Sequence, residues 1–221
     1  MKAMILAAGR GERMRPLTDK IPKPLIEVGG QKLIEYHIHA LAKAGVTELV
    51  INHAWLGDQI VSHLGDGNQY GVNIAYSAEL EGALETAGGI AHALPLLGDE
   101  PFIVVNGDVW TDFDYSTLTP PVKQAHLIMV SNPNHHPVGD FSLKAGFAQR
   151  IGDDKLTFSG IAVYRPELFK KLPQPRYPLG PLLRDAMDVY EVTGAYFAGE
   201  WFDIGTVQRL TELDRQLRGY T

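Results

Sequence analysis

The stretch Leu6-Ala-Ala-Gly-Arg-Gly-Glu-Arg-Met-Arg-Pro-Leu-Thr18, followed by Pro22-Lys23-Pro24-Leu25, decides the fold of this chain. The apolar segment 3–6 leads into it and predicts a buried strand that ends in a Gly-rich loop, where open α/β sheets bind ligands. Gly9 and Gly11 allow the backbone to approach a ligand closely and to turn its N–H groups toward it. Residues 1–23 contain six lysines and arginines against two acids, so we expect this loop to bind an anion.

The loop lacks the two best-known phosphate-binding patterns. No Gly-Lys-Ser/Thr follows the glycines, as a P-loop requires, and Arg13 and Met14 stand where a dinucleotide-binding fingerprint has its closing glycine. Pro16, Pro22 and Pro24 prevent a regular helix directly after the glycines. We therefore expect an extended loop in which side-chain cations, rather than a helix dipole, hold phosphate.

Taken together, these residues resemble the signature Leu-Ala-Ala-Gly-x-Gly-x-Arg, Pro-Leu-Thr and Lys-Pro of the sugar-1-phosphate nucleotidyltransferases. The resemblance extends from Met1 to about Leu213. It implies an enzyme that moves a nucleotidyl group from a nucleoside triphosphate to a sugar 1-phosphate. The implied fold is α/β, a Rossmann-like, doubly wound, mostly parallel mixed sheet with a smaller sugar-binding β subregion. An ordinary strand and turn with basic surface residues is the alternative, which the motif disfavours.

Composition limits the class of protein. The chain has 221 residues, 45% of them hydrophobic, which predicts one domain, 1–221, with a nucleotide-binding half, 1–113, and a sugar-binding half with the C-terminal helix, 114–221. Cysteine is absent, so catalysis uses no thiol. The net charge of -6 argues against a nucleic-acid partner, and no leader or long apolar run is visible, which predicts no membrane association and a cytoplasmic location. The β-helical tail of longer family members is absent, which slightly favours a monomer over a homodimer.

Strand and helix patterns alternate along the chain, which predicts a parallel sheet covered by helices. In the first half we predict strands at 3–6, 47–52, 72–77 and 101–106 and helices at 31–45, 55–64 and 85–97. The Gly88-Gly89 pair is expected to weaken the last of these helices. In the second half we predict strands at 125–130, 140–143 and 158–164 and helices at 166–172, 180–188 and 206–218.

Two aspartates are candidate ligands for Mg²⁺. Asp108 follows a buried strand in Asn106-Gly-Asp108, at the sheet edge that carries the Gly-rich loop, and a carboxylate there can bind a hard cation. Its alternative role is a simple turn after the strand. Asp203 lies in Trp201-Phe-Asp-Ile-Gly-Thr206, which resembles the Trp-x-Asp-x-Gly-Thr segment of the family. Its alternative role is that of a bystander beside the helix cap Thr206.

The resemblance also implies a role for each site residue. Lys23, expected on a surface loop, is implied to bridge the two reacting phosphates, and Arg13 to hold the departing pyrophosphate. The implied ligands of Mg²⁺ are Asp108 and Asp203, and no general base is needed because the attacking phosphate oxygen is already ionised. The implied nucleotide-binding residues are Leu6, Ala8, Gly9, Gly11, Glu12, Arg13, Lys23, Glu79, Gly82 and Asn106. The implied sugar-binding residues are Asn106, Gly139, Asp140 and Ser159.

The nucleotide base is left open by the residues themselves. Segment 79–87 resembles the family loop in which a Gln precedes Leu-Gly-Thr-Ala, but the residues nearest to that Gln are Glu79 and Glu81, and Glu85 replaces the glycine. A carboxylate only accepts hydrogen bonds, so it suits uracil or guanine. The whole pattern resembles most the short N-acetylmuramate-1-phosphate uridylyltransferases of cell-wall recycling, which implies UTP. The alternatives are a mannose-1-phosphate guanylyltransferase, a guanine-transfer enzyme of cofactor synthesis and a non-catalytic regulatory protein that binds nucleotide sugars.

The sugar is inferred from a missing motif. Many family members have Glu-Lys-Pro before the strand predicted at 158–164, where the Glu accepts hydrogen bonds from the sugar ring, and this chain lacks the triplet. A carboxylate there would repel the lactyl carboxylate of N-acetylmuramate, so its absence suits that sugar. The His135-His136 pair lacks the spacing of a helical zinc site, and Trp55 is expected to be an ordinary packing or surface aromatic. The cations considered near the lactyl group are Lys144, Arg150 and Lys155.

Overall fold

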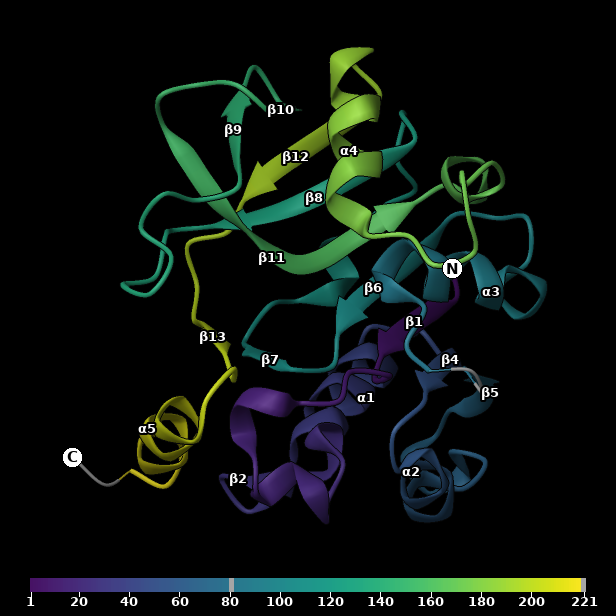
Figure 1. Ribbon diagram of the computed structural model, residues 1–221, viewed down its shortest axis with the longest axis vertical. Helices are drawn as coiled ribbons and strands as arrows, with labels where there is room; N and C mark the ends of the chain where they lie inside the picture. The colour runs from purple at the N-terminus through teal and green to yellow at the C-terminus, as the bar shows by residue number, and fades with distance from the viewer. Residues whose placement is uncertain (80–81, 220–221) are drawn as a thin grey trace.

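The computed structural model describes residues 1–79 and 82–219. Its main sheet has nine strands in the order β5-β4-β1-β6-β11-β8-β12-β10-β9 and runs through both halves of the chain (Figure 1). In chain order, the strands of this sheet are β1 (Ala3–Leu6), β4 (Glu48–His53), β5 (Asn73–Ala78), β6 (Phe102–Asn106), β8 (Ala125–Val130), β9 (Phe141–Lys144), β10 (Phe147–Gln149), β11 (Lys155–Tyr164) and β12 (Val192–Tyr196).

The first half of the sheet is parallel, whereas most pairs in the second half are antiparallel. β1 pairs in parallel with β4 and β6, and β4 pairs in parallel with β5. β11 runs antiparallel to β6 and β8, and β10 runs antiparallel to β9 and β12, while β8 and β12 are parallel. The predicted mixed, Rossmann-like sheet is confirmed, with more antiparallel pairing than the mostly parallel sheet that we expected. The strands from β8 to β11 follow one another without an intervening helix. A parallel pair needs a long crossover, usually a helix, so the pairs that these strands form with one another are antiparallel.

Helices cover both faces of the sheet because alternate residues of its strands point to opposite sides. Ile5 of β1 belongs to a cluster with residues of α1 and α2, while Met4 belongs to a cluster with residues of α3 and α4. Figure 1 shows α5 apart from the main sheet, where Leu213 shares a small cluster with Val28. No helix in the described part of the chain is long and apolar enough to span a membrane. The helices are α1 (Leu33–Lys43), α2 (Gly57–Leu64), α3 (Glu85–Leu97), α4 (Leu179–Asp188) and α5 (Val207–Leu217).

The glycine pair in α3 provides close contacts instead of weakening the helix. A Cβ atom at Gly88 would collide with the carbonyl oxygen of Pro175, and one at Gly89 would lie 2.6 Å from Oε1 of Glu79. The helix runs without a break over the predicted range. The two glycines therefore allow segments on either side of α3 to approach its backbone.

Two short pairs of strands lie beside the main sheet, and neither was predicted. β2 (Glu27–Val28) pairs with β3 (Gln31–Lys32), and β7 (Val109–Thr111) pairs with β13 (Trp201–Asp203), both in antiparallel fashion. Strands of two or three residues are too short for an alternating pattern to be recognised in the sequence. The second pair matters most, because it joins the segment after β6 to the segment before α5.

His37, on α1, anchors the start of β7 from inside the core. Its Nε2–H donates to the carbonyl oxygen of Val109 at 2.8 Å, and its Nδ1 accepts from the hydroxyl of Tyr115 at 3.0 Å. Burial lowers the pKa of His37 from 6.5 to about 4, which holds the ring neutral. Because Val109 follows Asp108 directly, this contact also supports the position of that aspartate.

We expect His37 to lower the free energy of unfolding by about 2 kcal/mol between pH 7 and pH 5. The unfolded chain binds a proton at the ordinary pKa near 6.5, whereas the folded chain resists protonation down to a pKa of about 4. This contribution to stability is therefore complete above pH 6.5 and is lost as the pH falls toward 4. Urea unfolding of the wild type and of His37→Gln at both pH values measures it, with the exposed His39→Gln as control. An equal pH dependence in the wild type and His37→Gln would contradict the prediction.

Candidate nucleotide and sugar site

A cavity of about 460 Å³ opens at the carboxyl ends of β1, β4 and β6. Open α/β sheets bind their ligands at this edge, because the loops that leave the strands meet there. The cavity also includes Asn52 and Gly205, which we did not predict. The structure therefore gathers most of the predicted nucleotide-binding residues in one place. The predicted residues that line it are Leu6, Ala8, Gly9, Gly11, Glu12, Arg13, Lys23, Glu79, Asn106 and Asp108.

Glu79 connects three segments of the cavity wall. Its surface is only 5% exposed, and both carboxylate oxygens accept hydrogen bonds from the protein. Nδ2 of Asn52 donates to Oε1 at 2.7 Å, and the backbone N–H of Leu84 donates to Oε2 at 2.7 Å. Oδ1 of Asn52 in turn accepts from the backbone N–H of Ala7 at 2.8 Å. Base selection by Glu79 stays a prediction, and Glu81 lies outside the described residues.

The Gly-rich loop is braced by Trp55, which precedes α2. Gly11 has a left-handed backbone with φ of +69°, and Oγ1 of Thr18 donates to its carbonyl oxygen at 2.8 Å. Arg10 pairs with Asp19 and lies 3.9 Å from the centre of the Trp55 ring. Nε1 of Trp55 donates to the carbonyl oxygen of Thr18 at 3.0 Å. Trp55 is 41% exposed, as expected of a surface aromatic, but its side chain also holds the loop, a role that we did not predict.

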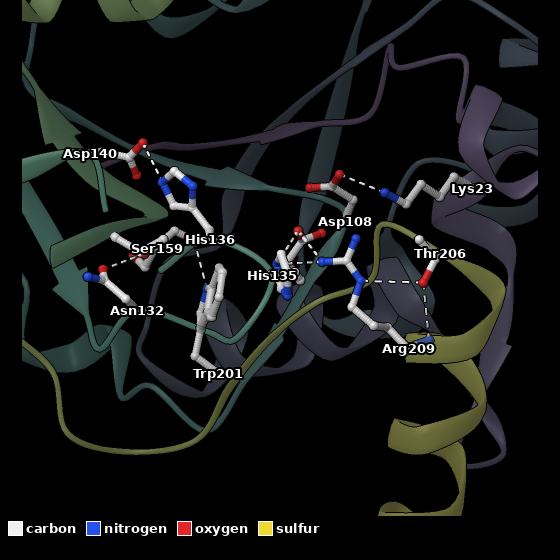
Figure 2. A network of polar contacts seen from close by, with 12 residues as sticks. Lys23, Asp108, Asn132, His135, His136, Asp140, Ser159, Trp201, Thr206 and Arg209 are labelled. Carbon is white, nitrogen blue, oxygen red and sulfur yellow. Dashed lines mark hydrogen bonds and ion pairs between the residues drawn. The ribbon is translucent and has the colours of Figure 1, made fainter. Parts of the chain in front are cut away.

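Lys23 points into the cavity from a short turn. Only 7% of its surface is exposed, so our expectation of a surface-loop lysine is wrong. Its Nζ lies 2.6 Å from Oδ2 of Asp108. Figure 2 shows the two side chains pointing toward each other. Short turns replace a regular helix after the glycines, as the prolines predict. These 3₁₀ turns are η1 (Glu12–Met14), η2 (Leu17–Asp19) and η3 (Lys23–Leu25).

Asp108 and Asp203 come together because β7 pairs with β13. The backbone N–H of Ile204 donates to the carbonyl oxygen of Asp108 at 2.9 Å, so the two aspartates lie on neighbouring backbone segments. Oδ2 of Asp203 accepts from Nη1 of Arg209 at 2.7 Å and lies 3.3 Å from Nε2 of His135. Figure 2 shows the side chains of Arg209 and His135 meeting each other. Asp203 itself does not line the cavity.

The two aspartates form a donor set that suits Mg²⁺. This ion prefers oxygen ligands and usually takes one or two carboxylates from the protein together with substrate phosphates. In the contacts among the described residues, each aspartate uses only Oδ2, so each keeps Oδ1 for another ligand. The described residues contain no group of three His, Cys, Asp or Glu side chains that could hold a metal alone. The arrangement therefore fits an ion that is bound jointly with phosphate.

Two guanidinium groups converge on Gly205 at the wall of the cavity. A Cβ atom at Gly205 would lie 3.1 Å from Nη2 of Arg13 and would collide with Nη2 of Arg209. Arg13 extends from η1, and Arg209 extends from α5, the helix that Thr206 caps. We predicted Arg13 but not Arg209. The position of Arg209 in the first turn of the helix that follows Asp203 was the signal in the sequence that could have indicated it. Arg13 lines the cavity, so its charge favours the binding of an anion there, whereas Arg209 is paired with Asp203 and is not part of the lining.

A second cavity, of about 360 Å³, adjoins the first. Asp140, which we predicted to bind the sugar, lines it. Oδ2 of Asp140 accepts from the backbone N–H of Phe158 at 2.8 Å, and Oδ1 lies 3.1 Å from Nε2 of His136. A ligand that fills both cavities would therefore pass the residues that the two linings share. The residues that line both cavities are Glu85, Thr86 and Asn106.

Besides Asp203, three predicted residues lie outside the lining of both cavities. Gly82 and Gly139 have left-handed backbones with φ of +97° and +67°. Ser159 is 1% exposed, and its Oγ accepts from the backbone N–H of Ile161 at 3.1 Å. Contacts of these three residues with a ligand stay predictions. Glu85, in contrast, lines both cavities and has φ of +61°, a conformation that favours the glycine of the family pattern.

Known proteins resemble this chain over nearly its whole length. A relative from Neisseria meningitidis serogroup B, named N-acetylmuramate alpha-1-phosphate uridylyltransferase, is 56% identical over 222 residues and 96% of each chain. The protein of that name from Caulobacter vibrioides is 34% identical, over 93% of this chain and 92% of its own. The solved inositol-1-phosphate CTP transferase from T. maritima matches with a TM-score of 0.79 at 19% identity, over 99% of this chain and 95% of that one, which shows the fold alone.

The family follows from these matches and from the geometry of the site. The Gly-rich loop, Lys23 and Asp108 meet at the edge of the sheet where the first cavity opens. The model of the nucleotidyl transferase family matches residues 2–136, which include all three. This chain is therefore a member of the nucleotidyl transferase family.

Proposed function

We propose that this protein transfers a uridylyl group from UTP to a sugar 1-phosphate, with N-acetylmuramate α-1-phosphate as the acceptor. The observation that carries the proposal is the joined pair of cavities, in which Asn106 lines both and the Lys23–Asp108 pair lines the first. The relative that is 56% identical, named for this reaction, supports the choice of substrates. An enzyme with this acceptor takes part in peptidoglycan recycling in the cytoplasm.

The reaction joins two anions, so the main task of the protein is to position and neutralise them. A phosphate oxygen of the sugar attacks the α-phosphorus of UTP, the bond from that phosphorus to the bridging oxygen breaks, and pyrophosphate leaves. No proton moves, because the attacking oxygen is already ionised. The ammonium group of Lys23 neutralises charge at the reacting phosphates, and Arg13 holds the departing pyrophosphate.

We further propose that Asp108 and Asp203 hold Mg²⁺ together with the phosphates. When bound, the ion supplies positive charge that stabilises the charge developing in the transition state. In the described structure Lys23 and Arg209 each pair with one of the two aspartates, so each carboxylate already faces a positive group. Both carboxylates are held in place by these contacts before a substrate binds.

A pyrophosphate-release screen tests the proposed reaction. Five nucleoside triphosphates are combined with a panel of sugar 1-phosphates, and kcat/KM is measured for each active pair. With UTP, we expect kcat/KM for N-acetylmuramate 1-phosphate to be at least about tenfold higher than for N-acetylglucosamine 1-phosphate, a difference of about 1.4 kcal/mol. A preference for GTP with mannose 1-phosphate would favour the guanylyltransferase alternative. Binding of nucleotide sugars without any pyrophosphate release would favour the regulatory protein.

A further inference from the structure

The second cavity has two acidic side chains and one arginine in its wall. Glu85 and Asp140 are the acids, and Arg184, on α4, is the cation among the described residues that line it. Lys144, Arg150 and Lys155, the cations that we considered from the sequence, do not line this cavity. Arg150 is instead paired with Asp188, at 2.8 Å. Arg184, which we did not predict, is therefore the residue that brings positive charge to this cavity.

The acids of this cavity are already engaged, whereas the arginine is not. Asp140 accepts from Phe158 and lies close to His136, and Glu85 lies 3.4 Å from Nη2 of Arg176. Arg184 has no carboxylate within ion-pair distance among the residues that the structure describes. Its guanidinium therefore keeps its donors for a ligand, and a guanidinium binds a carboxylate best through two parallel hydrogen bonds.

Gly180 provides space for the guanidinium of Arg184 at the wall of the second cavity. It precedes Arg184 by four residues on α4, so the two residues are neighbours on the helix surface. A Cβ atom at Gly180 would lie 3.2 Å from Nη1 of Arg184, which is tighter than an ordinary contact. The missing side chain therefore leaves room for the guanidinium over the first turn of α4, and both residues line the cavity.

We propose that Arg184 binds a carboxylate that the sugar carries in addition to its phosphate, which makes it a specificity-determining residue for sugars with an acidic ether substituent. This inference rests on the proposed function and names the group that selects its acceptor. A neutral N-acetylhexosamine has no group that uses the charge of Arg184. An acidic substituent would meet the repulsion of Glu85 and Asp140 if the cavity lacked this cation.

The test compares two acceptors in the full chain with UTP. Arg184→Gln is expected to lower kcat/KM for N-acetylmuramate 1-phosphate about tenfold and to leave kcat/KM for N-acetylglucosamine 1-phosphate within about twofold. Arg150→Gln is the matched control, because it removes an arginine that lies outside the cavity, and it should change neither value. Esterifying the lactyl carboxylate should lower the wild-type value as the variant does, and should lower the variant no further.

The outcomes separate this inference from the proposed function. A wild-type enzyme that does not use the lactyl sugar overturns the proposed function without any variant. If the wild type prefers the lactyl sugar and Arg184→Gln keeps the same preference, only the role of Arg184 is overturned. An equal loss on both acceptors also overturns it, because a general effect on the shape of the cavity does not depend on the carboxylate. Thermal unfolding of each variant confirms that the fold is intact.

Discussion

Lys23→Met is expected to lower kcat by about 10²–10³-fold, because the ammonium group acts most strongly on the charge that develops in the transition state. Met keeps an unbranched side chain of similar length, so it preserves the apolar packing of the buried lysine stem. The rate of pyrophosphate release at saturating UTP and sugar 1-phosphate measures the loss. The buried position makes Met a better probe than Ala, which would also leave a cavity.

Lys20→Met is the matched control for this experiment. Lys20 lies on the same proline-rich segment, but its side chain is exposed and does not line the cavity. We expect it to retain the wild-type rate. Removal of Lys23 leaves Asp108 without its partner, but the aspartate side chain is 39% exposed, so water can solvate it and the fold should persist. A Lys23→Met enzyme with more than half of the wild-type rate would show that Lys23 does not act on the phosphates.

Asp108→Asn and Asp203→Asn are each expected to raise the Mg²⁺ concentration for half-maximal activity at least about tenfold. Each substitution keeps the size of the side chain and removes one negative charge from a hard oxygen ligand, so the ion is held less tightly. Activity titrated against Mg²⁺ at fixed substrate concentrations measures the shift. Because the two carboxylates serve one ion, we also expect the shifts not to add in the double variant.

The control for the aspartates is Asp112, which directly follows β7. Oδ1 of Asp112 accepts from the backbone N–H of Glu200 at 2.7 Å, and Asp112 does not line the cavity. Asn can accept the same hydrogen bond, so Asp112→Asn should leave the Mg²⁺ titration unchanged. If Asp108→Asn and Asp203→Asn both give the wild-type titration curve, the shared metal site is rejected.

Elements that are determined by neighbouring residues in the chain were predicted correctly from the sequence. The helix at Glu85–Leu97 was predicted with its observed bounds, and Thr206 caps α5 through a hydrogen bond from the backbone N–H of Arg209, as its position before the last helix suggested. The loop after β1 was predicted to lack a regular helix because proline restricts the backbone wherever it occurs. These features depend on residues that are neighbours in the chain, so their physical causes can be read from the sequence.

The contacts that build the site depend on residues far apart in the chain. β7 and β13 carry three residues each, too few for a period, and only their pairing brings Asp203 beside Asp108. Lys23 is buried although its segment is rich in charge, because η3 turns it toward the cavity. The position of α4 beside the second cavity likewise decided which cation lines that wall. It is Arg184, and not one of the three cations considered from the sequence, which are Lys144, Arg150 and Lys155.

The sequence by itself determined the family and the edge of the sheet at which the first cavity opens, and it predicted the residue types that would bind phosphate. The cause is local, since a buried strand followed by glycines, cations and prolines can form few structures. The tertiary structure alone decided which of those residues are free to act. Arg10 is held by Trp55 and Asp19, whereas Arg184 has no carboxylate within ion-pair distance among the described residues. The charge of a side chain can be read from the sequence, whereas its ion-pair partner depends on tertiary contacts between residues far apart in the chain.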